Sequence, residues 1–140
     1  KIVHQVWLGG HPLPEQFGVW RRTWEKHHPG WKHILWTEKE AEQLDMVDRK
    51  AYEDAPNIGA KSDVLRREAV YRFGGLYVDT DFECLAPFDA LHESLDFYAS
   101  LSNVGSIEVS NGIFAASKKH PLIHSLLTTP PSALSPAGGA

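Results

Sequence analysis

Two aspartates, Asp79 and Asp81, stand one residue apart in the stretch GGLYVDTDFECL, at the end of an apolar run. In an extended strand, side chains at positions i and i+2 point to the same face, so the two carboxylates would project together. Two like charges that close repel and raise each other's pKa unless a cation neutralises them. The spacing therefore predicts a site for Mg²⁺ or Mn²⁺, which take carboxylates, water and phosphate as ligands. A solvated strand end stays open as the alternative.

The segment before this pair carries Asp63 and Arg66, which are three residues apart and so share one face of a helix. An isolated pair of this kind is ordinarily a surface ion pair of small energetic consequence. Beside the D-x-D segment, however, the Arg could bind a diphosphate and the Asp could bind a sugar hydroxyl.

The elements that must position these side chains alternate between strands and helices. An apolar stripe predicts a helix over residues 60–73, which ends at Gly74 and Gly75. We expect strands at 1–8, 31–36, 76–79 (extending toward 82), 97–101 and 112–116, and helices at 15–28, 37–44, 60–73 and 120–127, with a short helix and loop up to 56. This order predicts an α/β layer fold with a largely parallel sheet.

Composition limits the classes of function. The chain has 140 residues, enough for one domain, and its net charge of −4 gives no basic surface for nucleic acid. Its single cysteine, Cys84, excludes an internal disulfide framework and a multi-thiolate zinc site. The chain opens directly on a strand-like segment, so we expect an incomplete domain over 1–127, followed by a Pro/Ser/Ala/Gly-rich, disordered tail at 128–140.

The chain resembles the glycosyltransferases that have a DXD-containing sugar-binding region. The resemblance is to glycosyltransferase family 32, which includes initiating α-1,6-mannosyltransferases, inositol phosphoceramide mannosyltransferases and bacterial capsular polysaccharide enzymes. The chain is also distantly similar to the glucosylating domain of the large clostridial toxins. The stretches that carry the resemblance are KIVHQVWLGG, HPGWKHILW, AKSDVLRREAVYRFGGLYVDTDFECLAPFD and SNGIFAASKKHPL. It implies a GT-A type fold with a mixed, mostly parallel sheet. The implied activity is transfer of a hexose from a UDP- or GDP-sugar to a glycan or glycolipid acceptor, with retention of anomeric configuration.

The resemblance also implies roles for residues that hold the donor. Trp7 matches the aromatic residue that stacks on the nucleotide base. Asp63 and Arg66 match groups that hold the donor sugar and the diphosphate, and Tyr77 matches a tyrosine near the phosphates.

The D-x-D carboxylates take the metal in this reading. Asp81 matches the direct ligand of Mn²⁺ or Mg²⁺, and Asp79 matches the carboxylate shared between ribose or sugar and the metal shell. Asn111 falls where the related toxins place a sugar-contacting Asn. The metal and Arg66 would stabilise charge on the leaving phosphate. We expect front-face transfer, in which that phosphate deprotonates the acceptor hydroxyl.

Two other functions stay open at this point. A haloacid-dehalogenase-like phosphatase also has a D-x-D after an apolar strand, although here no acidic pair follows Lys118 and Lys119. A nucleotide-sugar-binding fragment without catalysis is the second alternative, because full family members are longer. We expect the cytoplasm or the cytoplasmic membrane face for a bacterial protein, with peripheral membrane association of the parent protein, and the Golgi lumen for a fungal one.

Overall fold

The computed structural model describes residues 1–102 and 108–129, and a single mixed sheet is its centre. The strands of this part of the chain are β1 (Ile2–Val6), β2 (Lys32–Trp36), β3 (Gly75–Val78), β4 (Phe97–Ser102) and β5 (Glu108–Ala116). Their spatial order is β2-β1-β3-β5-β4, with β1 parallel to both of its neighbours and β5 antiparallel to β3 and β4. The mixed sheet expected from the sequence is confirmed, with two parallel and two antiparallel pairings among the described strands.

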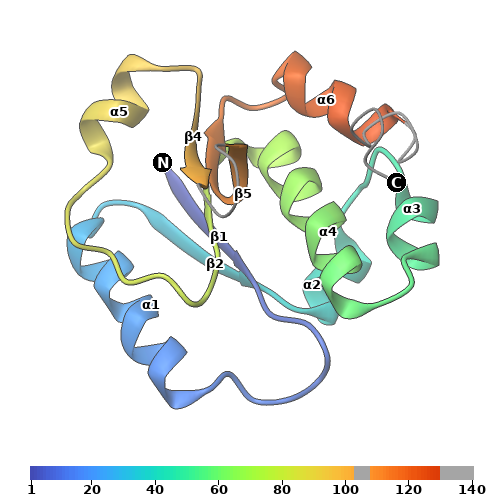
Figure 1. Ribbon diagram of the computed structural model, residues 1–140, viewed down its shortest axis with the longest axis horizontal. Helices are drawn as coiled ribbons and strands as arrows, with labels where there is room; N and C mark the ends of the chain where they lie inside the picture. Colours follow the sequence, from blue (N-terminus) through green and yellow to red (C-terminus); the bar gives the residue numbers. More distant parts are fainter. Residues whose placement is uncertain (103–107, 130–140) are drawn as a thin grey trace.

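Helices cover both faces of the sheet (Figure 1). They are α1 (Glu15–His27), α2 (Glu38–Gln43), α3 (Arg49–Asp54), α4 (Ile58–Phe73), α5 (Asp89–Ser94) and α6 (Pro121–Thr128). One face carries α4 and α6 with the short α2 and α3, whereas α1 and α5 lie on the other.

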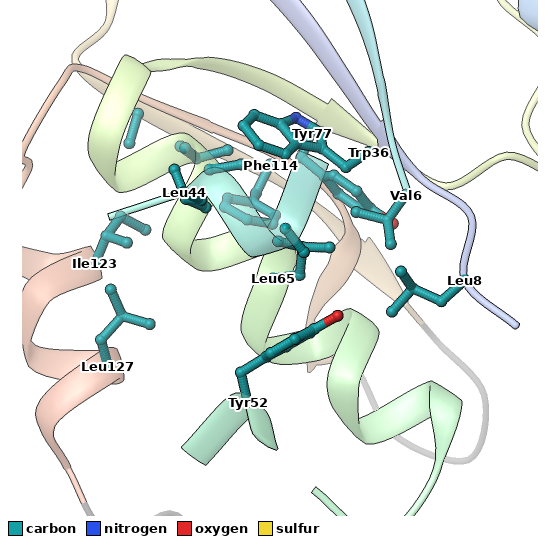
Figure 2. Packing of buried hydrophobic residues seen from close by; sticks show 14 residues of the cluster. Val6, Leu8, Trp36, Leu44, Tyr52, Leu65, Tyr77, Phe114, Ile123 and Leu127 are labelled. Atoms are coloured by element: carbon teal, nitrogen blue, oxygen red, sulfur yellow. The ribbon is translucent and has the colours of Figure 1, made fainter. Parts of the chain in front are cut away.

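A hydrophobic cluster fills each of the two layers. The larger cluster lies between the sheet and α4, and Figure 2 shows Leu65, Tyr77, Phe114 and Ile123 packed there. The smaller cluster on the α1 face contains Val3, Trp24, Trp31, Leu76, Val78, Cys84 and Ala115. Because β3 contributes buried side chains to both clusters, the strand that leads into the D-x-D segment is fixed from both sides.

The turn from α4 into β3 is held by two glycines and a buried histidine. Gly74 and Gly75 have φ values of +68° and +115°, which residues other than glycine rarely adopt. A Cβ on Gly75 would lie 2.6 Å from the carbonyl oxygen of Ile2, so the backbones approach too closely for any other residue. The fully buried His4 donates from Nε2 to the Gly74 carbonyl at 2.8 Å and accepts at Nδ1 from the Trp36 indole N–H at 3.0 Å.

Some boundaries differ from the sequence-based expectation. β3 ends at Val78, and residues 79–82 form a turn in which the amide of Phe82 donates to the carbonyl of Asp79 at 3.4 Å. The expectation that the strand extends toward 82 is therefore wrong, and so is the strand geometry invoked to place the two aspartates on one face. Helix α5 was not predicted, because its six residues bury no side chain and give no apolar period. The tail was expected to begin at residue 128, but Thr128 is the last residue of α6, and residues 130–140 lie outside the described part of the chain.

Candidate active site

A pocket of about 460 Å³ opens where β1 and β3 end, beside the first turns of α4. Ligands of α/β proteins commonly bind at the carboxyl ends of parallel strands, where the chain leaves the sheet and side chains converge. The residues that line the pocket are Val6, Trp7, Leu8, Phe17, Ile58, Gly59, Ser62, Asp63, Arg66, Tyr77, Asp79, Thr80 and Asp81. The structure thus brings together all the predicted site residues except Asn111, which touches their polar network from β5.

The carboxylate of Asp79 is held through one of its two oxygens. Its Oδ1 accepts a hydrogen bond from the Tyr77 hydroxyl at 2.7 Å and lies 3.1 Å from Nη1 of Arg66. Its backbone N–H donates to the carbonyl of Gly112 in β5 at 2.8 Å. Burial raises the pKa of the Asp79 carboxyl, the contacts with Tyr77 and Arg66 oppose that rise, and the nearby Asp81 adds to it.

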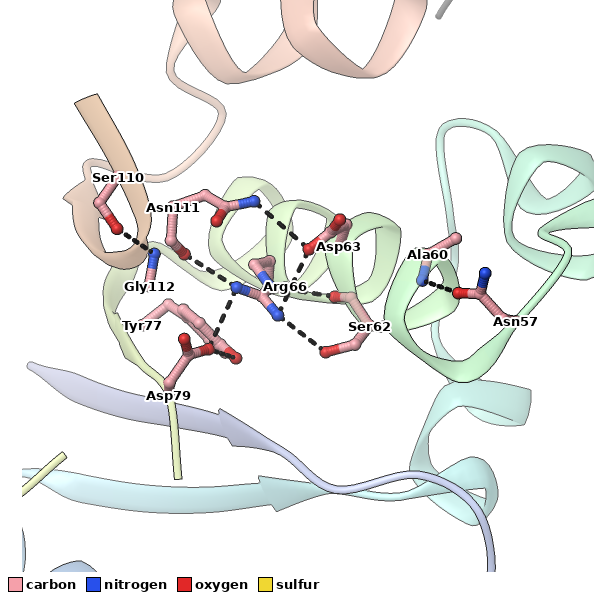
Figure 3. A network of polar contacts seen from close by, with 10 residues as sticks. All are labelled: Asn57, Ala60, Ser62, Asp63, Arg66, Tyr77, Asp79, Ser110, Asn111 and Gly112. Atoms are coloured by element: carbon pink, nitrogen blue, oxygen red, sulfur yellow. Dashed lines mark hydrogen bonds and ion pairs between the residues drawn. The ribbon is translucent and has the colours of Figure 1, made fainter. Parts of the chain in front are cut away.

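Arg66 is the centre of the polar network (Figure 3). Its side chain is only 9% exposed, and its guanidinium carbon lies 4.5 Å from the centre of the Tyr77 ring. Nε donates to the carbonyl of Ser62 at 3.2 Å, and Nη2 donates to the Ser62 hydroxyl at 2.9 Å. Nη1 donates to the carbonyl of Asn111 at 3.0 Å, so Arg66 ties helix α4 to strand β5.

Asp63 forms the α4 side of the pocket. Its Oδ1 lies 3.4 Å from Nη2 of Arg66 and accepts from the side-chain amide of Asn111 at 3.3 Å. Asp63 is half-exposed, with 47% of its side chain accessible, so it borders solvent and the pocket together. The predicted i, i+3 pair on α4 is thus present, but it belongs to a larger network rather than to an open surface.

Trp7 closes the pocket on the side of the loop after β1. Its indole N–H donates to the carbonyl of His11 at 2.8 Å, and its ring meets that of Phe17 edge to face at 5.8 Å. These contacts fix the ring while leaving it half-buried at the pocket wall. Stacking of Trp7 on a nucleotide base stays a prediction that this position allows.

The donor set at the D-x-D turn fits a hard divalent cation. Asp79 and the exposed Asp81 both line the pocket, whereas Glu83 does not. Within residues 1–102 and 108–129, no three His, Cys, Asp or Glu side chains gather at metal-binding distance. A cation here would therefore take two carboxylates from the protein and its other ligands from water and phosphate, the arrangement typical of Mg²⁺.

Gly112 is a site residue that sequence reasoning missed. A Cβ at this position would lie 2.9 Å from Oδ2 of Asp79 and 3.2 Å from the Phe82 ring, so only glycine lets β5 approach the carboxylate. The Asn111-Gly112 pair was the available signal in the sequence. Its meaning depends on the antiparallel pairing of β3 with the distant strand β5, in which Val78 pairs with Ile113.

The comparison with protein families decides what kind of site this is. Residues 14–98 match the family described as glycosyltransferase sugar-binding region containing DXD motif. The chain belongs to this family. The matched span contains α4, β3 and the D-x-D turn, and it ends before β5, which supplies Asn111 and Gly112.

Curated relatives are mainly fungal mannosyltransferases. The chain is 29% identical over 131 residues to inositol phosphoceramide mannosyltransferase 1 of Schizosaccharomyces pombe, covering 89% of this chain and 40% of that protein. It is 28% identical over 155 residues to subversion of eukaryotic traffic protein A of Legionella pneumophila, covering 90% of this chain and 24% of that protein. A match to initiation-specific alpha-1,6-mannosyltransferase of Candida albicans has 29% identity over 102 residues and covers 64% of this chain and 26% of that protein. The chain thus spans two fifths or less of these relatives.

A solved structure supports the fold assignment. The PaToxG glycosyltransferase superposes with a TM-score of 0.73 at 18% sequence identity, over 91% of this chain and 58% of that one. The expected glycosyltransferase fold of GT-A type is confirmed.

Proposed function

We propose that the pocket binds a nucleoside diphosphate sugar together with a divalent cation, and that the complete protein transfers the hexose to a glycan or glycolipid acceptor. The observation that carries this proposal is the convergence of Trp7, Asp63, Asp79 and Asp81 on one pocket. Several relatives are named as mannosyltransferases, so mannose is the first donor sugar to test.

The charges around the pocket support the need for a cation. Three carboxylates, those of Asp63, Asp79 and Asp81, face one guanidinium, that of Arg66, among the described lining residues. An anionic diphosphate would meet a negative wall unless a cation entered first. Mn²⁺ or Mg²⁺, when bound, would neutralise the negative charge that develops on the leaving diphosphate.

The protein's own side chains would orient the donor. Trp7 offers an aromatic face at the pocket wall for the base. The Asp63 and Asp79 side chains are 47% and 33% exposed, and their carboxylate oxygens are acceptors suited to sugar hydroxyls. The apolar side chains that line part of the pocket, including Leu8 and Phe17, would exclude water from part of the donor.

Retention of configuration is part of the proposal. In front-face transfer the leaving phosphate accepts the proton of the acceptor hydroxyl as the new glycosidic bond forms and the sugar–phosphate bond breaks. No protein nucleophile takes part in this route. NMR of the product's anomeric proton would show the same configuration as the donor, and a sugar trapped covalently on Asp63 or Asp79 would contradict the route.

A thermal-shift panel tests donor binding. UDP- and GDP-hexoses are added with and without Mn²⁺ to the wild type, to Asp81→Asn and to Glu83→Gln, a matched exposed carboxylate outside the pocket lining. At 100-fold excess over Kd a ligand stabilises by about 2.7 kcal/mol. That corresponds to about 8 °C in Tm at roughly 3 °C per kcal/mol. We expect this Mn²⁺-dependent shift in wild type and Glu83→Gln and its loss in Asp81→Asn; no shift with any nucleotide sugar refutes the proposal.

A second candidate, donor binding without catalysis, is favoured by the 40% coverage of the first relative. Release of free hexose from the donor, or transfer to an added acceptor, distinguishes the two. The phosphatase alternative has lost its support, because the D-x-D of this chain lies within the glycosyltransferase family match.

A further inference from the structure

We infer that Arg66 is a positioning residue for the two pocket carboxylates, Asp63 and Asp79, and does not bind the donor diphosphate. This inference rests on the proposed function and revises the role that the sequence suggests for Arg66. A guanidinium has five N–H donors in a fixed plane and is well suited to phosphate, so its contacts in the folded protein decide what it can still bind.

The protein already occupies the guanidinium of Arg66. Its three nitrogens make five oxygen contacts: hydrogen bonds to the Ser62 carbonyl, the Ser62 hydroxyl and the Asn111 carbonyl, and ion pairs with Asp63 and Asp79. One face of the guanidinium lies over the Tyr77 ring. A diphosphate could bind Arg66 only by displacing one of these oxygens, and its own negative charge would then approach both carboxylates.

The contacts instead hold each carboxylate through one of its two oxygens. Arg66 engages Oδ1 of Asp79, which also accepts from Tyr77, and it engages Oδ1 of Asp63, which also accepts from Asn111. In each aspartate the second oxygen, Oδ2, has no partner among the hydrogen bonds and ion pairs of residues 1–102 and 108–129. Arg66 therefore fixes the Oδ1 atoms of two pocket-lining aspartates and leaves each Oδ2 as an acceptor without a protein partner in the described residues, which suits a cation or a sugar hydroxyl and not an anion.

Binding of Mn²⁺ alone separates positioning from phosphate contact, because the two roles predict opposite signs. Removing a nearby positive charge, as in Arg66→Met, strengthens cation binding if Arg66 acts only as a charge. If Arg66 positions Asp79, its loss weakens Mn²⁺ binding, and partners of metal ligands typically contribute 10- to 100-fold in affinity. Arg66→Lys keeps the charge but loses the planar fork, so only the positioning role predicts an effect.

The experiment measures Mn²⁺ affinity by electron paramagnetic resonance for the wild type, Arg66→Lys, Arg66→Met and the control Arg72→Lys. Arg72 lies on the same helix and pairs with the exposed Asp45, away from the pocket. We expect at least a 10-fold loss of Mn²⁺ affinity in both Arg66 variants and less than a 2-fold change in Arg72→Lys. Unchanged or tighter Mn²⁺ binding in the folded Arg66 variants overturns the inference.

Ser62→Ala keeps the test decisive if the Arg66 variants do not fold. It removes one hydroxyl that accepts from Nη2 and leaves the arginine in place. We expect a 2- to 5-fold loss of Mn²⁺ affinity, and an unchanged affinity overturns the inference in that case. If the wild type binds neither Mn²⁺ nor any nucleotide sugar, the proposed function fails; if the wild type binds Mn²⁺ and the variants bind it equally, only the role of Arg66 fails.

Discussion

His4 makes the stability of this fold depend on pH. Its ring is 0% exposed, and burial lowers its pKa from 6.5 to about 4 despite the hydrogen bond to Gly74. In the unfolded chain the same ring takes up a proton near pH 6.5. Between these two pH values the unfolded chain binds more protons than the folded one, so the free energy of unfolding falls as the pH falls.

The magnitude follows from the shift in the His4 pKa. A pKa of about 4 in the folded protein, against 6.5 in the unfolded chain, corresponds to about 3 kcal/mol of stability lost between pH 6.5 and pH 4. The structural cause is clear, since a proton on Nδ1 would remove the acceptor of the Trp36 N–H. The loss is a large part of the stability of an ordinary domain.

Urea unfolding at pH 7, 5.5 and 4 measures this loss in the wild type, in His4→Gln and in His11→Gln, an exposed control. We expect His4→Gln to be less stable than the wild type at pH 7 and to lose about 3 kcal/mol less on acidification. His11→Gln should follow the wild type. Equal losses in wild type and His4→Gln would show that the buried ring does not titrate as argued.

Three further outcomes follow from local packing. Gly75→Ala should destabilise the fold by more than about 2 kcal/mol in urea unfolding, because Gly75 has a φ of +115° and a Cβ there would collide with β1. Its control, Gly30→Ala, should change the free energy of unfolding little, since the space around Gly30 is open. Gly112→Ala should keep most of the Tm but reduce Mn²⁺-dependent nucleotide-sugar binding, since its Cβ would displace Oδ2 of Asp79; unchanged binding would contradict that placement. Cys84 is 3% exposed and burial raises the pKa of its thiol, so a thiol reagent should modify it only after unfolding, and fast modification of the folded protein would contradict its burial.

The sequence predicted most of the framework because its signals are local. The helix that ends at Gly74 was predicted from its apolar stripe and the Gly-Gly pair, and the structure places α4 at Ile58–Phe73. The helix begins at Ile58 rather than at residue 60, because Asn57 caps its N-terminus: the Asn57 side chain accepts a hydrogen bond from the amide of Ala60 at 2.8 Å. The family resemblance also depends on such local motifs, and the family match confirms it.

The details of the site could not be predicted, because they depend on distant pairings. The alternation in YVDTDF favours a strand, yet the chain turns after Val78, where the amide of Asp79 pairs with the carbonyl of Gly112. One of the hydrogen bonds that engage the Arg66 guanidinium goes to the Asn111 carbonyl, 45 residues away in the sequence. No spacing rule within α4 reveals that contact. The same sequence pattern therefore fits an Arg66 that binds phosphate and an Arg66 that positions the two aspartates.

Strand β5 sets the order in which the site can be assembled during synthesis. The family match ends at residue 98, and the D-x-D turn leaves the ribosome well before residues 111 and 112. Until β5 pairs with β3, the amide of Asp79 lacks its carbonyl partner and Arg66 lacks its contact with Asn111. A truncated product that contains the complete motif would therefore carry its aspartates on an unpaired sheet edge, exposed to association with other strands.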